Sequence, residues 1–262
     1  MACVLVTGGT GTLGSVLVPL LAARGHEVRS LSRHPSSPTS VPVPGVGPVH
    51  VLGDVRSGAG LLAAMAGVDA VVHTATSPRL SRAVEVEGTA NVVAEAAKVG
   101  AHVVYISIVG VDVMTYSYYR AKREAETIVE SGAAPWTIQR ATQFHDLIDR
   151  FLGWRVFPVT RNLSFQPVDT GDVSERLADL VDAGPSGRAD DFGGPTVVPL
   201  KELAAARRRI AGSATLLVPV PARGIFRDFD AGRHLCPHHA HGTLTWEEWL
   251  RSRPHRGETT ET

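Results

Sequence analysis

The sequence has little cysteine and no long apolar run, and these absences narrow the class of protein. Its 262 residues include only two cysteines, Cys3 and Cys236, which lie near opposite ends of the chain. A disulfide framework is therefore not expected. A location in a reducing compartment such as the cytoplasm is expected instead. No stretch of about 18 consecutive apolar residues occurs, so we expect no membrane span. The start lacks the charged segment of a signal peptide.

An excess of charge of either sign is also missing. Lysine plus arginine number 26, as do aspartate plus glutamate, so the formal net charge is zero. This balance gives no general attraction for nucleic acid or an anionic membrane. With 44% hydrophobic and 20% charged residues, the chain has the composition of one globular domain or of a domain with a small lobe. We therefore expect a small-molecule partner, with a monomer and a homodimer both left open.

Short apolar runs alternate with segments of helical period over the first 140 residues. This pattern is typical of βαβ units around a parallel sheet, and the continuously apolar runs indicate strands covered on both faces. We predict strands at Ala2–Thr7, Glu27–Ser32, Pro48–Leu52, Ala70–Thr74, His102–Ser107 and Trp136–Arg140. We predict helices at Leu13–Arg24, Gly60–Ala66, Arg82–Lys98 and Tyr118–Ser131. The expected fold is α/β, a doubly wound parallel sheet of the Rossmann type.

A glycine-rich turn joins the first predicted strand to the first predicted helix. It reads Thr7-Gly8-Gly9-Thr10-Gly11-Thr12-Leu13-Gly14. Glycines allow a tight turn and a close approach to a pyrophosphate, while the N-terminus of the helix presents free N–H groups to the anion. Between a strand and a helix, this pattern predicts a dinucleotide site. The expected contacts come from Thr7, Gly8, Thr10, Gly11, Thr12, Leu13 and Gly14.

The residues at the end of the second predicted strand indicate which dinucleotide is preferred. A carboxylate there would accept hydrogen bonds from the 2′-hydroxyl of NAD, but this sequence has Ser32 and Arg33. Arg33 can pair with a 2′-phosphate, so NADP(H) is expected in preference to NAD(H). Arg29 is an alternative partner. A solvated loop charge is the other interpretation of Arg33.

After about residue 150 the regular alternation fades. We predict a dinucleotide-binding domain over 1–150, a smaller substrate-covering lobe integrated with it over 151–250, and a disordered tail over 251–262. Helical patterns occur at Asp172–Asp182, Leu200–Ala211 and Trp246–Leu250, and the proline-rich stretch Arg33–Pro48 predicts a long loop. Aromatic residues suggest an apolar pocket wall: Phe144, Trp154, Phe157 and Phe165.

Together with the glycine-rich turn, several other segments resemble the short-chain dehydrogenase/reductase superfamily, and most closely its atypical, NmrA-like branch. These segments are Gly53-Asp54-Val55, Tyr118-Tyr119-Arg120-Ala121-Lys122, Trp136 to Phe144, Pro167 to Val173 and Gly242 to Leu250. The resemblance covers nearly the whole chain. It implies that Asp54 and Val55 contact the adenine, that Thr74, Ala75 and Thr76 line the ribose and pyrophosphate, and that Ala141, Thr142 and Phe144 flank the nicotinamide. The alternative for Asp54 is a helix cap.

Tyr118 and Lys122 are the candidate catalytic pair. They are spaced i, i+4 on a predicted helix, and a lysine ammonium beside a phenol lowers the pKa of the phenol toward neutrality. The resemblance implies that Tyr118 protonates the oxygen of a carbonyl that receives hydride, that Lys122 also holds the nicotinamide ribose, and that Ser107 polarises the carbonyl. Tyr116 and Tyr119 compete with Tyr118, and Ser107 lies early for its role. Where family members carry an asparagine, this chain has Glu85 to Thr89, so the catalytic set is incomplete.

Two functions remain open. We expect an NADPH-dependent oxidoreductase that reduces a ketone, quinone or related apolar or aromatic carbonyl compound. The alternative is a redox sensor that binds NADP(H) without turning it over. Cys236 to His241 could suggest a metal, but four neighbouring ligands cannot readily converge, so no metal site is expected. His73 is interpreted as a packed histidine and Arg207 to Arg209 as a solvated face.

Overall fold

A seven-stranded parallel sheet forms the centre of the computed structural model, which describes residues 1–33, 47–212 and 214–253. The strand order is β3-β2-β1-β4-β5-β6-β9. The strands are β1 (Cys3–Thr7), β2 (Glu27–Ser32), β3 (Val49–Leu52), β4 (Ala70–His73), β5 (His102–Ile108), β6 (Trp136–Ala141) and β9 (Gly187–Arg188). Every pair of neighbours is parallel. The predicted doubly wound sheet is confirmed.

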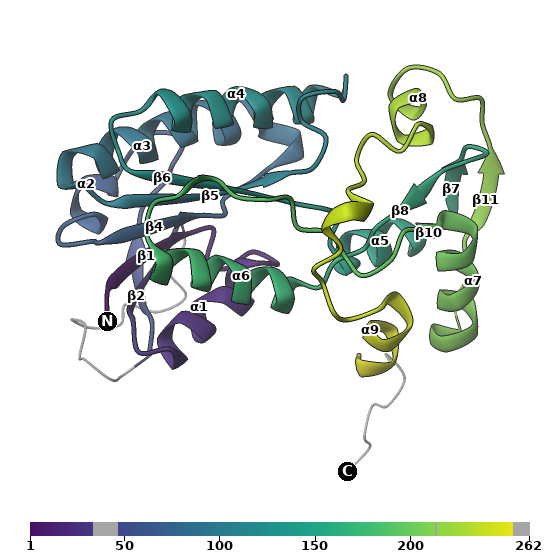
Figure 1. Ribbon diagram of the computed structural model, residues 1–262, viewed down its shortest axis with the longest axis horizontal. Coiled ribbons are helices and arrows are strands. Elements are labelled where there is room, and N and C mark those ends of the chain that lie inside the picture. The colour runs from purple at the N-terminus through teal and green to yellow at the C-terminus, as the bar shows by residue number, and fades with distance from the viewer. Residues whose placement is uncertain (34–46, 213, 254–262) are drawn as a thin grey trace, which may run out of the picture.

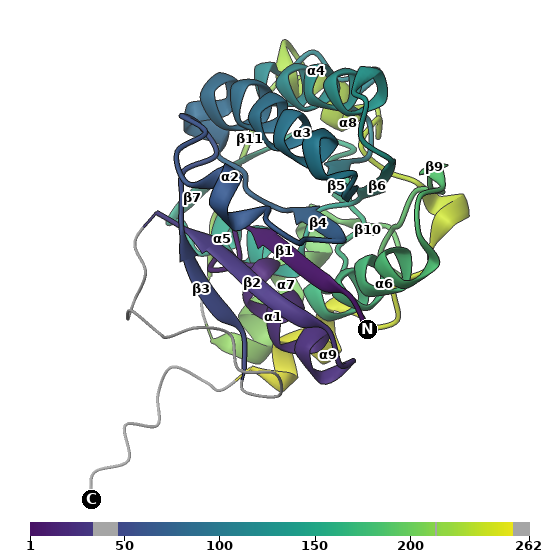
Figure 2. The ribbon, with the colours of Figure 1, turned by 90° about the vertical axis from the view of Figure 1, so that its left-hand side faces the viewer.

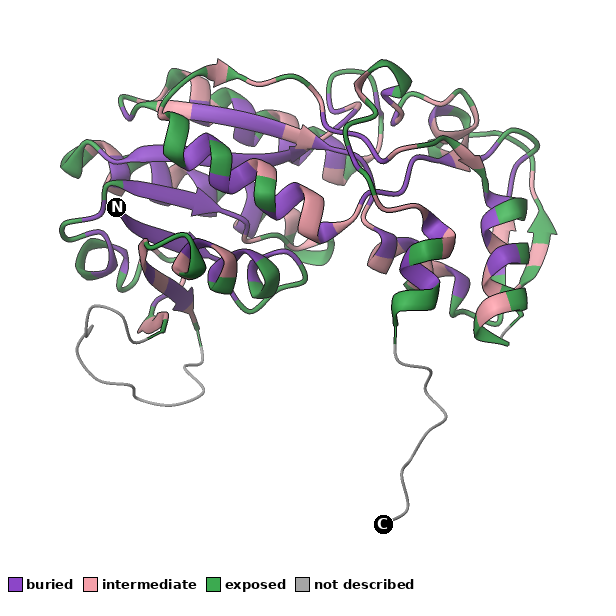
Figure 3. Cartoon of the chain, turned by 60° about the horizontal axis from the view of Figure 1, so that its bottom comes forward, coloured by how far each residue is buried: buried purple, intermediate pink, exposed green. Residues whose placement is uncertain are grey.

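Helices cover both faces of this sheet (Figures 1 and 2). On one face lie α2 (Leu61–Ala64), α3 (Gly88–Val99) and α4 (Ser117–Ser131), and on the other lie α1 (Gly14–Ala23) and α6 (Thr170–Ala183). Each face has its own apolar core, with Val92, Val129 and Tyr105 in one and Leu17, Leu177 and Val104 in the other. Figure 3 shows the sheet strands mostly buried and the outward sides of the helices exposed. Two-sided burial explains why the central strands β1, β4 and β5 are mostly apolar.

The remaining elements form a third cluster beside the sheet, on the right in Figure 1. They are α5 (His145–Leu152), β7 (Val156–Val159), β8 (Ser164–Phe165), β10 (Val198–Pro199), α7 (Leu200–Ala211), β11 (Leu216–Pro219), α8 (Ile225–Asp230) and α9 (Trp246–Ser252). β10 pairs antiparallel with β8, and β11 pairs parallel with β7. The Trp246 indole donates a hydrogen bond to the Leu203 carbonyl at 3.0 Å and so ties α9 to α7.

The structure corrects several predicted boundaries. The strand predicted to end at Ser107 extends one residue further, to Ile108, so Ser107 lies within β5 as predicted. The predicted helix Arg82–Lys98 is a π-helix over Arg82–Glu87 followed by α3. The tail predicted from 251 begins too early, because α9 continues to Ser252.

Other segments were not predicted or cannot be compared. β9 and the short strands beside α5 and α7 were missed. Most of the predicted loop Arg33–Pro48, and residues 254–262 of the predicted tail, lie outside the described residues. Among the helices that the structure describes, none is long and apolar enough to cross a membrane.

Candidate active site

The glycine-rich turn lies where β1 ends and α1 begins, and close backbone contacts fix its glycines. Gly8 has a φ of 70°, and a Cβ there would lie 2.8 Å from the backbone of Ala75. A Cβ on Gly14 would lie 2.3 Å from the carbonyl oxygen of Gly8 and 2.6 Å from the Gly9 Cα. Both distances are far shorter than ordinary contact, so neither position accepts a side chain unless the turn moves.

The N-terminus of α1 is open to an anion. Its N-cap residue, Leu13, provides no side-chain hydrogen bond, and the first turn carries no acidic residue. The neighbouring Thr10, Gly11 and Thr12 are exposed. Because the start of a helix carries the positive end of its dipole, this turn suits a pyrophosphate, even though the Ser15 and Val16 N–H groups already donate to the Gly11 and Leu13 carbonyls.

Charged side chains gather at the ends of β2 and β3. Arg33 is exposed and lies near enough to Asp54 for its charge to help lower the pKa of that carboxyl. Hydrogen bonds from Arg56 are the main cause of this lowering: its Nε lies 3.0 Å from each Asp54 oxygen, and its backbone N–H also donates to Asp54. Asp54 is therefore already paired with Arg56, a partner that the sequence reasoning missed, and Val55 is buried in the core.

Buried polar contacts at the end of β4 hold this edge of the sheet to the turn. The Thr7 hydroxyl lies 2.6 Å from His73 Nδ1, and Thr74 donates a hydrogen bond to the Thr7 carbonyl at 2.7 Å. His73 Nε2 lies 3.1 Å from the Thr89 hydroxyl. Burial, and next the nearby Lys122 charge, lower the pKa of His73 to about 4. A neutral, fully enclosed His73 agrees with the interpretation as a packed histidine.

Tyr118 and Lys122 do lie on one face of α4, and two further side chains join them. The Tyr118 hydroxyl lies 2.7 Å from Thr76 Oγ1, which donates to Glu85 Oε1 at 2.6 Å. Glu85 Oε2 lies 3.0 Å from Lys122 Nζ, and both side chains are almost completely buried. Lys122 also donates to the Ile106 carbonyl at 3.0 Å and lies over the Tyr105 ring. The result is a continuous chain of contacts from Tyr118 through Thr76 and Glu85 to Lys122.

The charges in this cluster correct one prediction. Burial opposes the charged form of Lys122, but the Glu85 carboxylate together with Tyr105 and Tyr118 outweighs burial, and the net pKa of Lys122 is raised. For Tyr118, burial raises the pKa, Lys122 lowers it and Glu85 raises it again, so the net pKa lies above its usual value. The expectation that Lys122 brings the Tyr118 pKa toward neutrality is wrong here, because burial raises this pKa more than Lys122 lowers it and Glu85 opposes the lysine charge.

Ser107 does not join this cluster through any hydrogen bond that the structure describes. It is 1% exposed and lies beside the Glu126 carboxylate of α4, whose pKa it helps Arg140 to lower against the effect of burial. Ala141 and Thr142, predicted to flank the nicotinamide, are buried as well, and the Thr142 hydroxyl donates to the Gln166 carbonyl at 2.6 Å. Phe144 is partly exposed.

Aromatic rings surround Tyr118 on the side of α8. Tyr116 and Tyr119 have ring centroids 6.4 and 6.3 Å from Tyr118, and Phe229 packs edge-on against Tyr119 at 6.1 Å. Phe165 contacts Phe229, so one predicted wall residue connects to this cluster. Phe157 packs instead with Phe151 in the third core, and the exposed Trp154 lies against both rings.

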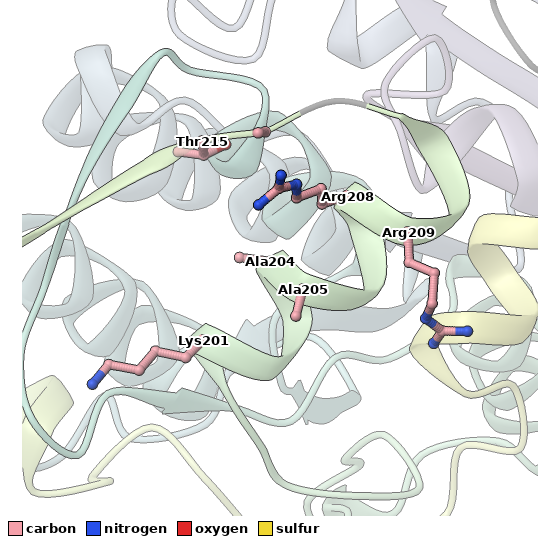
Figure 4. A pocket seen from close by; sticks show the side chains of 7 residues that line it. Lys201, Ala204, Ala205, Arg208, Arg209 and Thr215 are labelled. Carbon is pink, nitrogen blue, oxygen red and sulfur yellow. The ribbon is translucent and has the colours of Figure 1, made fainter.

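Two surface pockets lie away from Tyr118. One, of about 490 Å³, is lined by α7 and by Ala214 and Thr215. In Figure 4 the charged ends of its Lys201 and Arg209 point in opposite directions and do not converge on a ligand. The other lies along the acidic side of α6. Within the described residues, no group of three or more histidine, cysteine or acidic side chains could hold a metal ion.

Comparison with known proteins agrees with this geometry. The model of the NAD(P)H-binding family matches residues 8–183. A 3-beta-hydroxysteroid dehydrogenase of Mycolicibacterium neoaurum is 41% identical over 34% of this chain and 27% of its own length. The mouse 3 beta-hydroxysteroid dehydrogenase type 7 is 34% identical over 46% of this chain and 37% of its own length. The chain thus matches less than half the length of either relative.

Solved structures share the fold at low identity. The NADPH-dependent quinone oxidoreductase QOR2 of Escherichia coli, solved with NADPH, has a TM-score of 0.77 and 17% identity, over 94% of this chain and 98% of that chain. A UDP-glucose 4-epimerase of Thermus thermophilus, solved with NAD, has a TM-score of 0.70 and 20% identity, over 95% and 96%. The two structures hold different dinucleotides, so the likeness extends to the fold and not to a choice of cofactor.

Proposed function

The chain belongs to the NAD(P)H-binding family, and from that premise we propose that it is an NADPH-dependent reductase of a ketone, quinone or related apolar carbonyl compound. Tyr118 is the proton donor and Lys122 is its partner. The observation that carries the proposal is the position of the Tyr118 hydroxyl, 2.7 Å from Thr76 just beyond the end of β4. Ligands of open parallel sheets bind at these carboxyl ends of the strands.

The turn after β1 fits the cofactor. Its glycines admit a close approach, its helix N-terminus is open, and Arg33 at the end of β2 can pair with a 2′-phosphate. When bound, NADPH supplies the hydride for the carbonyl carbon. Tyr118 then gives its proton to the carbonyl oxygen, which would otherwise become an alkoxide. The other predicted cofactor contacts stay predictions: Ser32, Asp54, Val55, Thr74, Ala75, Thr76, Lys122, Ala141, Thr142 and Phe144.

The proposed substrate class follows from the surroundings of Tyr118. Its neighbours are apolar or aromatic: Ile108, Val111, Met114, Tyr116, Tyr119 and Phe229. Such a wall binds a ring system or an alkyl chain by excluding water and offers few groups to hold a sugar. The names of the steroid dehydrogenase and quinone oxidoreductase relatives suggest the same chemistry.

Steady-state loss of NADPH absorbance tests the proposal, with a panel of hydroxysteroid ketones, alkyl aryl ketones and quinones. We expect turnover with at least one of them, and Tyr118→Phe should lower kcat about 10²- to 10⁴-fold, the usual contribution of a positioned acid. Tyr116→Phe is the matched control, because it removes a neighbouring phenol and keeps the aromatic wall. An unchanged rate in Tyr118→Phe would exclude Tyr118 as the acid.

One observation favours a second function, a redox sensor that binds NADP(H) without turnover. Lys122 is neutralised by Glu85, and Ser107 lies beside Glu126, with no hydrogen bond to Tyr118 among the described residues. A protein with this function would bind NADPH tightly, show no turnover with the panel, and capture a protein partner in one redox state only. Turnover that depends on Tyr118 would exclude it.

A further inference from the structure

Glu85 is a buried carboxylate to which the sequence reasoning gave no role. Its side chain is fully enclosed, and its two oxygens have different partners. Oε2 faces Lys122, while Oε1 accepts hydrogen bonds from the Thr76 hydroxyl and from the Ser77 backbone N–H at 2.9 Å. A fully buried carboxylate is costly unless it is paired in this way. Glu85 therefore links the segment after β4 to helix α4.

The hydrogen bonds at Thr76 fix the direction in which the Tyr118 hydroxyl points. A threonine hydroxyl has one hydrogen, and Thr76 gives it to Glu85. In its 2.7 Å contact with Tyr118, Thr76 therefore accepts, and the phenol donates. The neutral phenol satisfies this arrangement, whereas a phenolate could not donate.

The backbone around Glu85 is adapted to bring it inward. Glu85 lies in the π-helix Arg82–Glu87, and such wide turns inside helices often occur at functional sites. On the same element, Arg82 and Glu87 have side chains 75% and 55% exposed, so Glu85 is its only buried charge among the described residues. Gly88 and α3 follow directly and anchor the segment against Val55.

We propose that Glu85 is a positioning residue that neutralises Lys122 and, through Thr76, holds Tyr118 in its proton-donating form. The part of the inference that concerns reaction direction rests on the proposed function. With a protonated Tyr118, the site favours carbonyl reduction over alcohol oxidation at neutral pH. In reduction the carbonyl carbon gains the hydride of NADPH, its oxygen gains the Tyr118 proton, NADP⁺ is formed, and the tyrosinate regains a proton from solvent.

The other groups around the cluster leave Glu85 and Lys122 as its opposing charges. From β4, His73 faces Lys122 and is neutral, because burial lowers its pKa to about 4. From β5, Tyr105 lies under Lys122, and burial keeps it protonated by raising its pKa. Helix α4 contributes Tyr118 and Lys122 themselves. Removing the Glu85 charge therefore leaves the lysine charge uncompensated beside the phenol.

Tyrosinate absorbance in the ultraviolet, recorded against pH, tests the proposal without substrate or turnover. The Tyr118 signal is obtained as the difference between each protein and the same protein with Tyr118→Phe. We expect wild-type Tyr118 to titrate above about 10, the ordinary value. Glu85→Gln keeps the size and an acceptor oxygen but removes the charge, and should shift this titration downward by about one pH unit or more. Adding Lys122→Met should reverse the shift, because the effect acts through the lysine charge.

The matched control is Glu87→Gln, which removes an exposed carboxylate from the same element and should leave the titration unchanged. A Tyr118 titration that stays in place or rises in Glu85→Gln would overturn the proposal. If that variant does not fold, the wild-type titration decides, since a value below the ordinary one contradicts a Tyr118 held in its protonated form. A downward shift without any turnover would support the role of Glu85 and refute only the proposed reductase.

Discussion

Arg33 is expected to decide the choice between NADPH and NADH, and Arg33→Ala tests this directly. Arg56, another cation at this edge of the sheet, is already held by Asp54 through its Nε and its backbone N–H. A hydrogen bond to a charged group contributes about 1.5–3 kcal/mol. Because Arg33 is exposed, water and salt screen its charge, and we take the lower part of that range, about 1.5–2 kcal/mol.

At about 1.4 kcal/mol for each factor of ten, this energy corresponds to a loss of about 10- to 30-fold in NADPH affinity. NADH lacks the 2′-phosphate and should lose almost nothing. Isothermal titration calorimetry of both cofactors measures the two affinities, with Arg208→Ala, an exposed arginine of α7, as the control. If Arg33→Ala leaves the ratio of the two affinities unchanged, or weakens both cofactors equally, the reasoning about the end of β2 is wrong.

Two further predictions concern the turn and the buried histidines. Gly14→Ala should weaken NADPH binding about tenfold or more, because its Cβ would lie 2.3 Å from the Gly8 carbonyl oxygen. Ser15→Ala is the control. An unchanged calorimetric affinity of Gly14→Ala for NADPH would contradict the assignment of this turn as the pyrophosphate site. His102 is buried, and burial lowers its pKa from 6.5 to about 4. Its contribution to stability is thus complete above pH 6.5 and is lost progressively as the pH falls from 6.5 through about 4, where the folded state also binds the proton. The wild-type protein should therefore lose about 2 kcal/mol of its free energy of unfolding between neutral pH and about pH 5 because of His102. His102→Gln should not show this part of the loss when urea denaturation is compared at the two pH values. Exposed His238→Gln is the control and should lose as much as the wild type.

The centre of the sheet was predictable because β1, β4 and β5 are buried on both faces, and a continuous apolar segment between turns has few other stable environments. β1 to β6 all lie within a residue or two of the predicted runs. β9 was missed because Gly187 and Arg188 are too short a run to form a pattern. β7, β10 and β11 each contain a proline, Pro158, Pro199 and Pro219, which argues against a strand in any reading of the sequence alone. The proposed division of the chain at residue 150 stays a prediction.

The candidate site was predictable only where its residues are close in sequence. The spacing of Tyr118 and Lys122 places both on one face of α4, and the family model confirms the resemblance from which their roles were inferred. Glu85 lies 37 residues before Lys122, and no local pattern indicates that a π-helix brings them to 3.0 Å. Ser107 shares a strand face with Tyr105, since alternate residues of a strand point the same way, so its side chain faces α4 as Tyr105 does. This pattern does not indicate that Ser107 contacts Glu126.

Transfer of deuterium tests the central claim most directly. NADPH carrying deuterium at C4, prepared separately in each of its two configurations, is incubated with the wild-type chain and an accepted ketone, and the alcohol is analysed by mass spectrometry. The proposed reductase predicts that one of the two cofactors gives an alcohol with deuterium on the former carbonyl carbon, and that the proton on its oxygen comes from the protein and solvent. Binding of NADPH with no deuterium in the product of any ketone of the panel, and no loss of NADPH absorbance with any quinone, would contradict the reductase and leave the sensor.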